Sequence, residues 1–291
     1  MLETKDVSSK TCLITGASRG LGKYLAEYFW QKSWNLLLVA RDQKQLEQLV
    51  DSLEKRDDQN VHCISADFGE ESAPFEIIKT ARSLTANLDL LINNAACQGS
   101  IGPLWENDWQ EWEKTIRVNL LAPVALCKEA ASWMLPAKKG GIINLSGGGA
   151  TGPRANFTAY ATAKAGLVRF SETLAEELKS FGITVNCLAP GTMGTDMMKE
   201  VVSKGDALAG KREYEIAVKT LKEGGTSMEK VAHLCHFLAN ESGSEITGKL
   251  ISAVWDNWEV WPEHLAELSQ SDVYTLRRIA GRDRGLPWGD K

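Results

Sequence analysis

Residues 15–22 read TGASRGLG, a stretch that follows a short apolar run and precedes a helix-length amphipathic segment. Its glycines, Gly16, Gly20 and Gly22, form the pattern G-x-x-x-G-x-G. Glycine suits a tight turn that brings the backbone close to a pyrophosphate, whose charge is held by free N–H groups at a helix N-terminus. By itself the pattern fits an ordinary strand-to-helix turn equally well. Its place at the start of a repeated strand-helix series favours dinucleotide binding.

Strand-like apolar runs alternate with amphipathic stretches along most of the chain. Parallel strands joined by helices produce this order, with helices on both faces of the sheet. The sequence therefore predicts an α/β fold, a Rossmann-like doubly wound parallel sheet of about seven strands. The expected strands are 11–15, 35–40, 61–66, 88–93, 141–146, 183–189 and 249–254. The expected helices lie near 20–33, 42–57, 71–86, 106–134, 157–181 and 227–239.

Two regions interrupt this alternation. Residues 192–226 carry several glycines and mixed charge after a strand, at the place where such folds have a mobile substrate lid. Residues 255–291 are rich in tryptophan and too short for an independent domain. We therefore expect one domain over residues 1–254, with the lid inside it. The extension 255–291 is expected to pack on this domain or on a neighbouring subunit.

The composition favours a protein that acts on a small molecule in a reducing compartment. Across 291 residues, 33 basic and 38 acidic side chains give a net charge of −5, without the long basic run typical of nucleic-acid binding. The six cysteines are widely spaced, which predicts buried thiols and no metal site. The first residues lack the apolar core of a signal peptide, and no run of about 18 apolar residues occurs. We expect a cytoplasmic protein with no nucleic-acid and no membrane partner.

The end of the second expected strand indicates which dinucleotide binds. NAD-binding sheets have an acidic residue here for the adenosine ribose, whereas this chain has Ala40 followed by Arg41. Arg41 can meet the 2′-phosphate of NADP, and Arg19 in the glycine turn offers a second cation. Asp42 weakens the argument, because its carboxylate can serve a ribose hydroxyl instead. The two arginines together favour NADP over NAD.

A second motif, YATAK at 160–164, indicates the chemistry. Tyr160 and Lys164 are four residues apart, so they share one face of a helix. A free tyrosine has a pKa of about 10 and is a weak acid-base group near pH 7, but a neighbouring positive charge favours tyrosinate. A bare Y-x-x-x-K is more often a buried tyrosine beside a surface lysine. With the glycine turn upstream, it predicts a proton-transfer pair that works with a hydride-carrying cofactor.

These motifs, in this order and spacing, resemble the short-chain dehydrogenase/reductase family. The resemblance covers roughly residues 8–250, and its motifs are TGASRGLG, Asp67, NNAA at 93–96, Asn119, Tyr160 with Lys164, and Pro190-Gly191. It implies that Tyr160 is the acid-base residue, that Lys164 lowers its pKa and holds the nicotinamide ribose, and that Asn119 holds a water in a proton relay.

The resemblance also implies where the cofactor lies. Asp67 should contact the adenine, Asn93 and Ala95 should line the channel, and Thr195 should meet the carboxamide or the phosphates. The residues expected to bind the cofactor are Gly16, Ser18, Arg19, Gly20, Leu21, Gly22, Arg41, Asp67, Phe68, Asn93, Ala95, Tyr160, Lys164, Pro190, Gly191 and Thr195.

One residue of the family's catalytic group is not at its usual position. The family usually has a serine 13 residues before the tyrosine, and in this chain that position is Gly147. Ser146 is one residue too early, and successive side chains of a strand point to opposite faces. Either the glycine run 147–149 bends the backbone so that Ser146 orients the substrate oxygen, or a backbone N–H, Asn156, Thr158 or a water replaces the hydroxyl. We assign the role provisionally to Ser146.

The sequence thus predicts an NADP(H)-dependent reductase or dehydrogenase that interconverts a ketone and a secondary alcohol, as a homodimer or homotetramer. Its small-molecule substrate should meet the loops 94–105 and 148–158, the lid and the C-terminal extension. Trp105 and Trp109, with some tryptophans of the extension, can stack on a sugar or aromatic ring. Two alternatives stay open. One is an epimerase or dehydratase of a sugar-like substrate that uses the cofactor transiently, and the other is an NADP-binding regulator with impaired chemistry.

Overall fold

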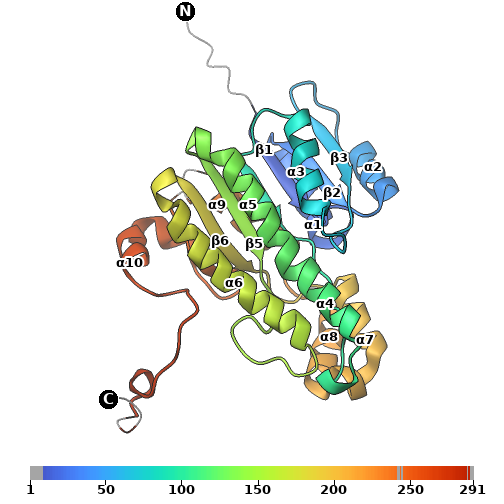
Figure 1. Ribbon diagram of the computed structural model, residues 1–291, viewed down its shortest axis with the longest axis vertical. Helices are drawn as coiled ribbons and strands as arrows, with labels where there is room; N and C mark the ends of the chain where they lie inside the picture. The colour runs from blue at the N-terminus through green and yellow to red at the C-terminus, as the bar shows by residue number, and fades with distance from the viewer. Residues whose placement is uncertain (1–8, 241–242, 244, 287, 289–291) are drawn as a thin grey trace, which may run out of the picture.

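The computed structural model describes residues 9–240, 243, 245–286 and 288 of the chain (Figure 1). A seven-stranded parallel sheet has the order β3-β2-β1-β4-β5-β6-β7, which confirms the predicted doubly wound α/β fold. Its strands are β1 Thr11–Thr15, β2 Asn35–Ala40, β3 Val61–Ser65, β4 Leu90–Asn93, β5 Gly140–Leu145, β6 Ile183–Ala189 and β7 Leu250–Ser252.

Helices connect the strands and cover both faces of the sheet. The α-helices are α1 Gly20–Gln31, α2 Gln43–Ser52, α3 Ala73–Leu84, α4 Trp109–Ile116, α5 Ala122–Met134, α6 Thr158–Leu178, α7 Asp196–Ala209, α8 Lys211–Glu223, α9 Met228–Leu238 and α10 Leu265–Gln270. A π-helical turn, η2 Arg117–Leu121, joins α4 to α5. Short 3₁₀ turns are η1 Leu104–Glu106, η3 Leu135–Ala137, η4 Lys179–Phe181, η6 Trp258–His264 and η7 Gly281–Arg284.

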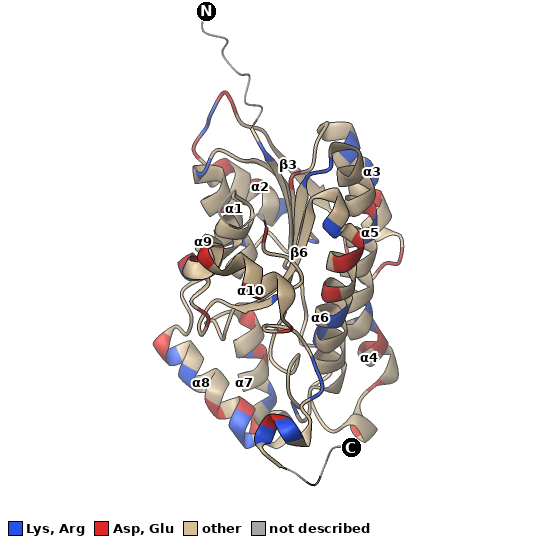
Figure 2. Cartoon of the chain, turned by 90° about the vertical axis from the view of Figure 1, so that its left-hand side faces the viewer, with Lys and Arg blue, Asp and Glu red and all other residues tan. Residues whose placement is uncertain are grey.

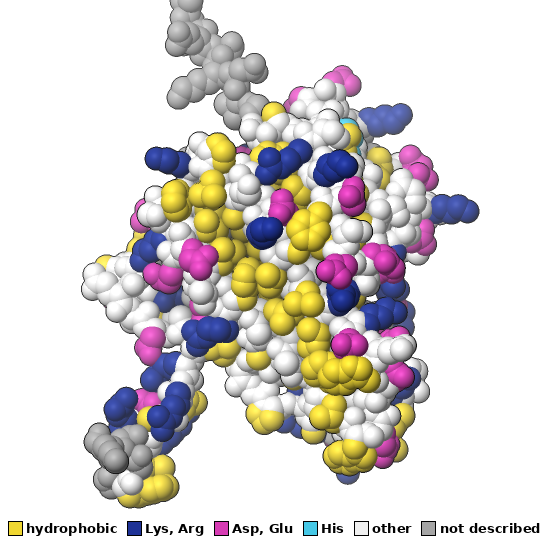
Figure 3. Space-filling model, in the orientation of Figure 1, with side chains coloured by type: hydrophobic (Ala, Val, Ile, Leu, Met, Phe, Trp, Pro, Cys, Tyr) yellow, Lys and Arg dark blue, Asp and Glu magenta, His cyan; other side chains and the backbone are white. Residues whose placement is uncertain are grey.

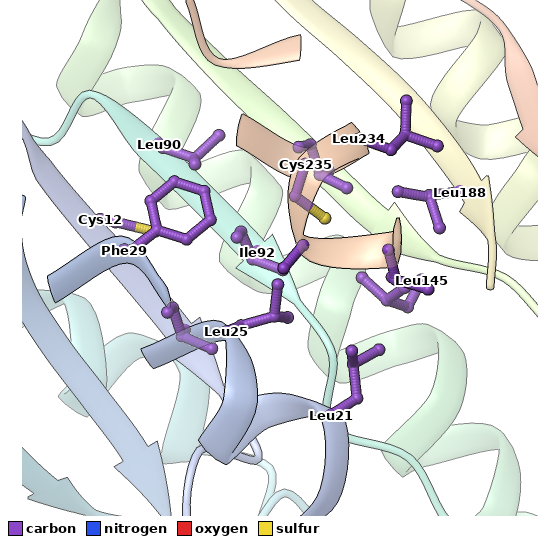
Figure 4. Packing of buried hydrophobic residues seen from close by; sticks show 14 of the residues in the cluster. Cys12, Leu21, Leu25, Phe29, Leu90, Ile92, Leu145, Leu188, Leu234 and Cys235 are labelled. Carbon is purple, nitrogen blue, oxygen red and sulfur yellow. The ribbon is translucent and has the colours of Figure 1, made fainter. Parts of the chain in front are cut away.

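Two apolar layers hold the helices to the sheet. On one face α1, α2 and α9 pack on the strands, and on the other α3, α5 and α6 do so, as Figure 2 shows with the sheet seen nearly edge-on. Figure 4 shows the first layer, where Leu25 and Phe29 of α1 and Cys235 of α9 meet Cys12 and Ile92 of neighbouring strands. Alternate residues of β1 enter opposite layers, because side chains of a strand alternate between faces.

The order of the strands places the site. β1 pairs with β2 on one side and with β4 on the other, so the chain reverses its direction of winding between β1 and β4. Open α/β sheets bind ligands at such a reversal, outside the carboxyl ends of the strands. The TGASRGLG turn leaves β1 at this point and enters α1.

The region expected to be a lid forms two helices, α7 and α8, below the sheet (Figure 1). Gly205 interrupts α7 with φ 74°, and Gly210 separates α7 from α8 with φ 82°. The inner side of this pair packs on the start of α6: Val201 and Ala217 lie in one cluster with Phe157 and Tyr160. The two helices therefore stand directly over the tyrosine of the YATAK motif.

The C-terminal extension lies against the main body over its described residues, 255–286 and 288. Trp258 and Trp261 are buried in the layer that contains α1 and α9. Further on, Tyr274 O accepts a hydrogen bond of 2.7 Å from Leu250 N at the outer side of β7. Lys249 Nζ donates to the carbonyls of Ser271 and Val273. The extension thus occupies the open edge of the sheet.

Among the described residues, no helix is both long and apolar enough to cross a bilayer, and no cluster of His, Cys, Asp or Glu has the geometry of a metal site.

Candidate active site

One large cavity of about 2110 Å³ lies at the carboxyl ends of the strands. Its wall includes the glycine turn after β1, Arg41, Tyr160 with Lys164, and residues of α7 and α8. Typical ligand pockets have about 300–1,000 Å³, so this one has room for a dinucleotide and a second small molecule. It brings together the predicted cofactor residues Gly16, Ser18, Arg19, Gly20, Leu21, Arg41, Asp67, Phe68, Ala95, Tyr160, Lys164, Pro190, Gly191 and Thr195.

The glycine turn has the tight backbone that a pyrophosphate cradle requires. Gly16 and Gly20 have φ of 68° and 54°, a region that side chains other than glycine rarely adopt. A Cβ on Gly16 would lie 2.9 Å from Ala95 Cα, and one on Gly22 would overlap the carbonyl oxygen of Gly16. Gly22 does not line the cavity, because its role is to let α1 approach the turn. The residues present therefore fit a bound dinucleotide.

Two arginines line the part of the cavity expected to hold the adenosine, and only one of them forms an ion pair within the described chain. Arg41 is exposed at the cavity wall, and within the described chain no carboxylate pairs with it. Asp42 is engaged elsewhere, because its carboxylate caps α2 by accepting hydrogen bonds from Gln45 N and Gln45 Nε2. Arg19 forms an ion pair with Asp196 at the start of α7, at 3.0 Å. Asp67 accepts from Gly69 N at 2.8 Å and keeps its carboxylate at the wall.

The NNAA segment after β4 divides its two asparagines between the sheet and the cavity. Asn93 is buried and donates to Asn144 Oδ1 at 2.8 Å, so its side chain braces β4 against β5 and lies outside the cavity lining. Asn94 lines the cavity and donates to Thr15 O at 2.9 Å. Thr15 Oγ1 accepts from both Asn94 N and Ala95 N. These bonds fix the segment, and the roles of Asn94 and Thr15 were not predicted from the sequence.

Asn119 lies in the π-helical turn η2, fully buried behind the cavity wall. Its Nδ2 donates to Cys97 O and Thr115 O, each at 2.9 Å, and its Oδ1 accepts from Cys97 N at 3.3 Å. The side chain therefore fixes the 94–100 segment beside Tyr160. π turns of this kind are frequent at functional sites. The relay role implied for Asn119 stays a prediction.

Tyr160 and Lys164 lie on one face of α6 at the inner end of the cavity. The Lys164 Nζ lies 5.7 Å from the centroid of the Tyr160 ring and donates to Leu145 O at 2.8 Å. Burial raises the pKa of Tyr160 to about 12, an effect that the positive charge of Arg154 opposes. Burial lowers the pKa of Lys164 to about 8. Both pKa values move toward the neutral form of the side chain, so Tyr160 carries its proton near pH 7 while Lys164 is still mostly charged. The lowering of the tyrosine pKa by Lys164 stays a prediction, because burial acts on Tyr160 in the opposite direction.

Gly147 occupies the position where the family usually has its catalytic serine, and Tyr160 lies directly beside it. A Cβ on Gly147 would overlap the Tyr160 hydroxyl, so the tyrosine oxygen occupies the space that a side chain at 147 would need. Ser146 continues β5 and donates its N–H to Leu188 O. Its Oγ is buried and, among the described residues, has no hydrogen-bond partner, Tyr160 included. The assignment of substrate orientation to Ser146 stays a prediction without a contact to support it.

A buried arginine that was not predicted from the sequence lines the same cavity. Arg154 lies on the 148–158 loop with its side chain 10% exposed, and its Nε pairs with Glu213 of α8 at 2.8 Å. Its Nη1 donates to Gln98 Oε1 at 3.2 Å, and Gln98 is itself buried. No local pattern marks these residues, since Arg154 and Glu213 are 59 positions apart. A charge in a glycine-rich loop is usually a solvated one.

The tryptophans expected to stack on a substrate ring lie apart from the cavity. Trp105 is 85% exposed, and Trp109 stacks on Trp112 with ring centroids 5.1 Å apart. Neither lines the cavity, whereas Trp255, 86% exposed at the start of the extension, does.

Gly191, with φ 79°, brings the turn after β6 close to Thr226 and Val254.

Comparisons with known proteins identify the family of this chain. Residues 10–206 match the family model described as short chain dehydrogenase. The short chain dehydrogenase/reductase dpchG of Colletotrichum higginsianum is 30% identical over 255 residues, which are 87% of this chain and 94% of that protein. The NADPH-dependent reductase BacG of Bacillus subtilis is 30% identical over 253 residues, 85% of this chain and 97% of that protein. The solved structure of YwfH, an NADPH dependent reductase involved in bacilysin biosynthesis, has a TM-score of 0.75 and 30% identity and covers 84% of this chain and 97% of its own. The matched span contains the glycine turn, NNAA and the Tyr160/Lys164 pair, and the chain belongs to the short-chain dehydrogenase/reductase family.

Proposed function

We propose that this protein is an NADP(H)-dependent oxidoreductase that interconverts a secondary alcohol and a ketone. The observation that carries the proposal is the shared cavity, since the glycine turn after β1 and the buried Tyr160/Lys164 pair line one space. The glycine turn would hold the phosphates of a dinucleotide, and Tyr160 and Lys164 would face its nicotinamide end. A substrate then fits between Tyr160 and the helices α7 and α8.

The cofactor supplies or accepts the hydride, and the protein handles the proton. In reduction, the Tyr160 hydroxyl gives its proton to the carbonyl oxygen as the hydride reaches the carbonyl carbon, which forms the alcohol. In oxidation, the tyrosinate takes the proton from the alcohol oxygen. Lys164, with a pKa of about 8, can exchange protons at neutral pH and would hold the nicotinamide ribose from the same helix face. The cluster of Ile101, Phe157 and Val201 around the tyrosine excludes water from this step.

A direct test measures NADPH oxidation with a panel of aldehydes, ketones and 3-oxo esters, with the alcohol product quantified alongside. We expect one alcohol for each NADPH consumed. Turnover of a sugar-like substrate without net NADPH consumption would instead support transient use of the cofactor by an epimerase or dehydratase. Tight NADPH binding without turnover of any kind would support the regulator.

The preference for NADP rests on Arg41. Its guanidinium is exposed at the adenosine end of the cavity, while Asp42 is occupied as the cap of α2. BacG and the structure of YwfH, both described as NADPH-dependent reductases, are consistent with this choice. Replacing Arg41 by Ala should weaken NADP binding by about 10- to 100-fold, the value of a hydrogen bond to a charged group. NAD binding should change by no more than about threefold, because NAD has no 2′-phosphate.

Calorimetry of NADP and NAD with the wild-type protein and with Arg41→Ala measures this difference. Lys55→Ala is the matched control, since it removes a surface cation outside the cavity lining. NAD binding at least as tight as NADP binding, together with an unchanged NADP affinity in Arg41→Ala, would show that the preference is wrong.

We also infer that the protein forms a homodimer. Figure 3 shows apolar side chains gathered over the face where α4 and α5 lie. Phe75 of α3, Trp109 of α4 and Leu121 of η2 are 43%, 61% and 49% exposed. The open edge of β7 is occupied by the chain's own extension, so a second copy cannot add a strand there. Sedimentation equilibrium should give twice the chain mass, and Leu121→Glu should shift the protein toward monomer. A monomeric wild type, or a tetramer that Leu121→Glu leaves intact, would contradict this inference.

The six cysteines are free thiols, which supports a cytoplasmic location.

A further inference from the structure

The glycine run 147–149 is shaped around other side chains. The space beside Gly147 contains the Tyr160 hydroxyl. A Cβ on Gly148 would lie 3.7 Å from Arg154 Cδ, and one on Gly149 would lie 3.2 Å from Arg154 Cβ and 2.6 Å from Ala161 Cβ. Gly149 also has φ 92°, which favours glycine. The run therefore admits both the tyrosine oxygen and an arginine to one wall of the cavity.

Arg154 fills this space with a charge that faces the tyrosine. Its Cζ lies 3.7 Å from the centroid of the Phe157 ring and 5.4 Å from that of Tyr160. Phe157 thus supports the guanidinium from one side, in a stacked arrangement typical of arginine. The side chain is nine-tenths buried, where a charge acts more strongly than it does in water. It lines the same cavity as Tyr160.

We propose that Arg154 is a positioning residue of the proton transfer, whose guanidinium stabilises negative charge at the Tyr160 oxygen in place of the hydroxyl that position 147 lacks. This proposal rests on the proposed function, because it assigns a part in the proton step of that reaction. It also explains why the serine position can be glycine: the same glycines that remove the hydroxyl make the room for the arginine.

The charged and titratable groups around Tyr160 come from helices α6, α7 and α8 and from two loops. Lys164 lies on the same helix, but its ammonium donates to Leu145 O. Cys97, from the segment after β4, raises the pKa of Tyr160, whereas Arg154 lowers it. Glu213 of α8 acts through Arg154, whose charge it partly neutralises. Glu200 of α7 lines the cavity and raises the pKa of Cys97. Arg154 should therefore lower the pKa of Tyr160, and Glu213, by partly neutralising Arg154, should raise it.

The opposite effects of Arg154 and Glu213 on the pKa of Tyr160 distinguish an electrostatic role of Arg154 from a purely structural one. If Arg154 and Glu213 only fasten α8 to the 148–158 loop, then removing either partner breaks the same contact. Both variants should then change KM in the same direction and leave the pH profile in place. If the guanidinium acts on the tyrosine, Arg154→Gln should raise the pKa of Tyr160 and Glu213→Gln should lower it.

The experiment measures the pH profile of kcat/KM in the oxidation direction, where the tyrosinate is the base and the rate rises with pH up to its pKa. Arg154→Gln should move this rising limb to higher pH by about one pH unit, which is about a tenfold loss on the limb. Glu213→Gln should move it to lower pH. Arg154→Lys should restore most of the wild-type position, and the double variant Arg154→Gln/Glu213→Gln should lie between the two single variants. The double variant also shows the effect without an unpaired buried charge, which matters if Arg154→Gln folds poorly.

A second readout requires no turnover. The ultraviolet absorbance of tyrosinate in the NADP complex, with the Tyr160→Phe form of each variant as its blank, follows the ionisation of Tyr160 alone. Opposite shifts in Arg154→Gln and Glu213→Gln support the proposal. Shifts in the same direction, or limbs that stay in place, overturn it. Opposite shifts in absorbance without any alcohol oxidation would leave the role of Arg154 intact and reject the proposed function.

Discussion

Replacing Tyr160 by Phe should lower kcat for carbonyl reduction by about 10²- to 10⁴-fold, the usual contribution of a positioned general acid. The fold should be unaffected, because the Tyr160 hydroxyl makes no hydrogen bond within the described part of the chain and the ring keeps its packing against Phe157 and Val201. We expect the free energy of unfolding to change by less than about 0.5 kcal/mol. NADPH affinity should also stay close to that of the wild type.

Steady-state kinetics, urea unfolding and NADPH binding measured on the same preparations test this prediction. Tyr214→Phe is the matched control, since Tyr214 of α8 lies outside the cavity lining and should leave kcat unchanged. A Tyr160→Phe protein that keeps more than about a tenth of the wild-type kcat would show that another group handles the proton.

Adding a side chain at position 147 should be nearly as damaging, although it restores the residue that the family usually has. The Cβ of Ser or Ala at Gly147 would overlap the Tyr160 hydroxyl, so the tyrosine must move. Its ring is buried in a packed cluster on α6 and cannot swing aside freely. A displacement of about 1 Å at a reacting group costs about 100-fold in rate. We expect Gly147→Ser and Gly147→Ala each to lose activity on this scale.

The pair of variants separates the steric effect from the hydroxyl. Equal losses of activity in Gly147→Ser and Gly147→Ala mean that the tyrosine oxygen needs the space beside Gly147. A gain of tenfold or more for Ser over Ala means that a hydroxyl at 147 can still serve the substrate oxygen. Wild-type rates in Gly147→Ala would contradict the account of the glycine run.

The strand-helix pattern predicted most of the fold from the sequence, because buried parallel strands are continuous apolar runs that end in turn residues. The runs at 11–15, 35–40 and 183–189 match their strands at both ends. The expected helix 106–134 is interrupted, since its π-helical turn at Arg117–Leu121 places Asn119 against Cys97. Periodicity over a long apolar stretch does not reveal one inserted residue.

The motifs correctly predicted which segments line the cavity, but they did not predict which side chains of those segments point into it. NNAA predicted a loop at the cavity, yet Asn93 faces the sheet and Asn94 faces the cavity, because neighbouring residues at a strand end point to opposite sides. The same one-residue difference separates Ser146 from Gly147. Arg154 and its partners Gln98 and Glu213 could not be predicted, since their meeting depends on how α8 packs over the 148–158 loop.

The most direct test of the central claim follows the hydride itself. NADPH that carries deuterium at the transferable position is incubated with a carbonyl substrate from the panel, and the alcohol is analysed by mass spectrometry and NMR. We expect one deuterium on the carbinol carbon for each NADPH oxidised, with the transfer suppressed in Tyr160→Phe. Product that forms without deuterium at that carbon, or with the NADPH unconsumed, would contradict it.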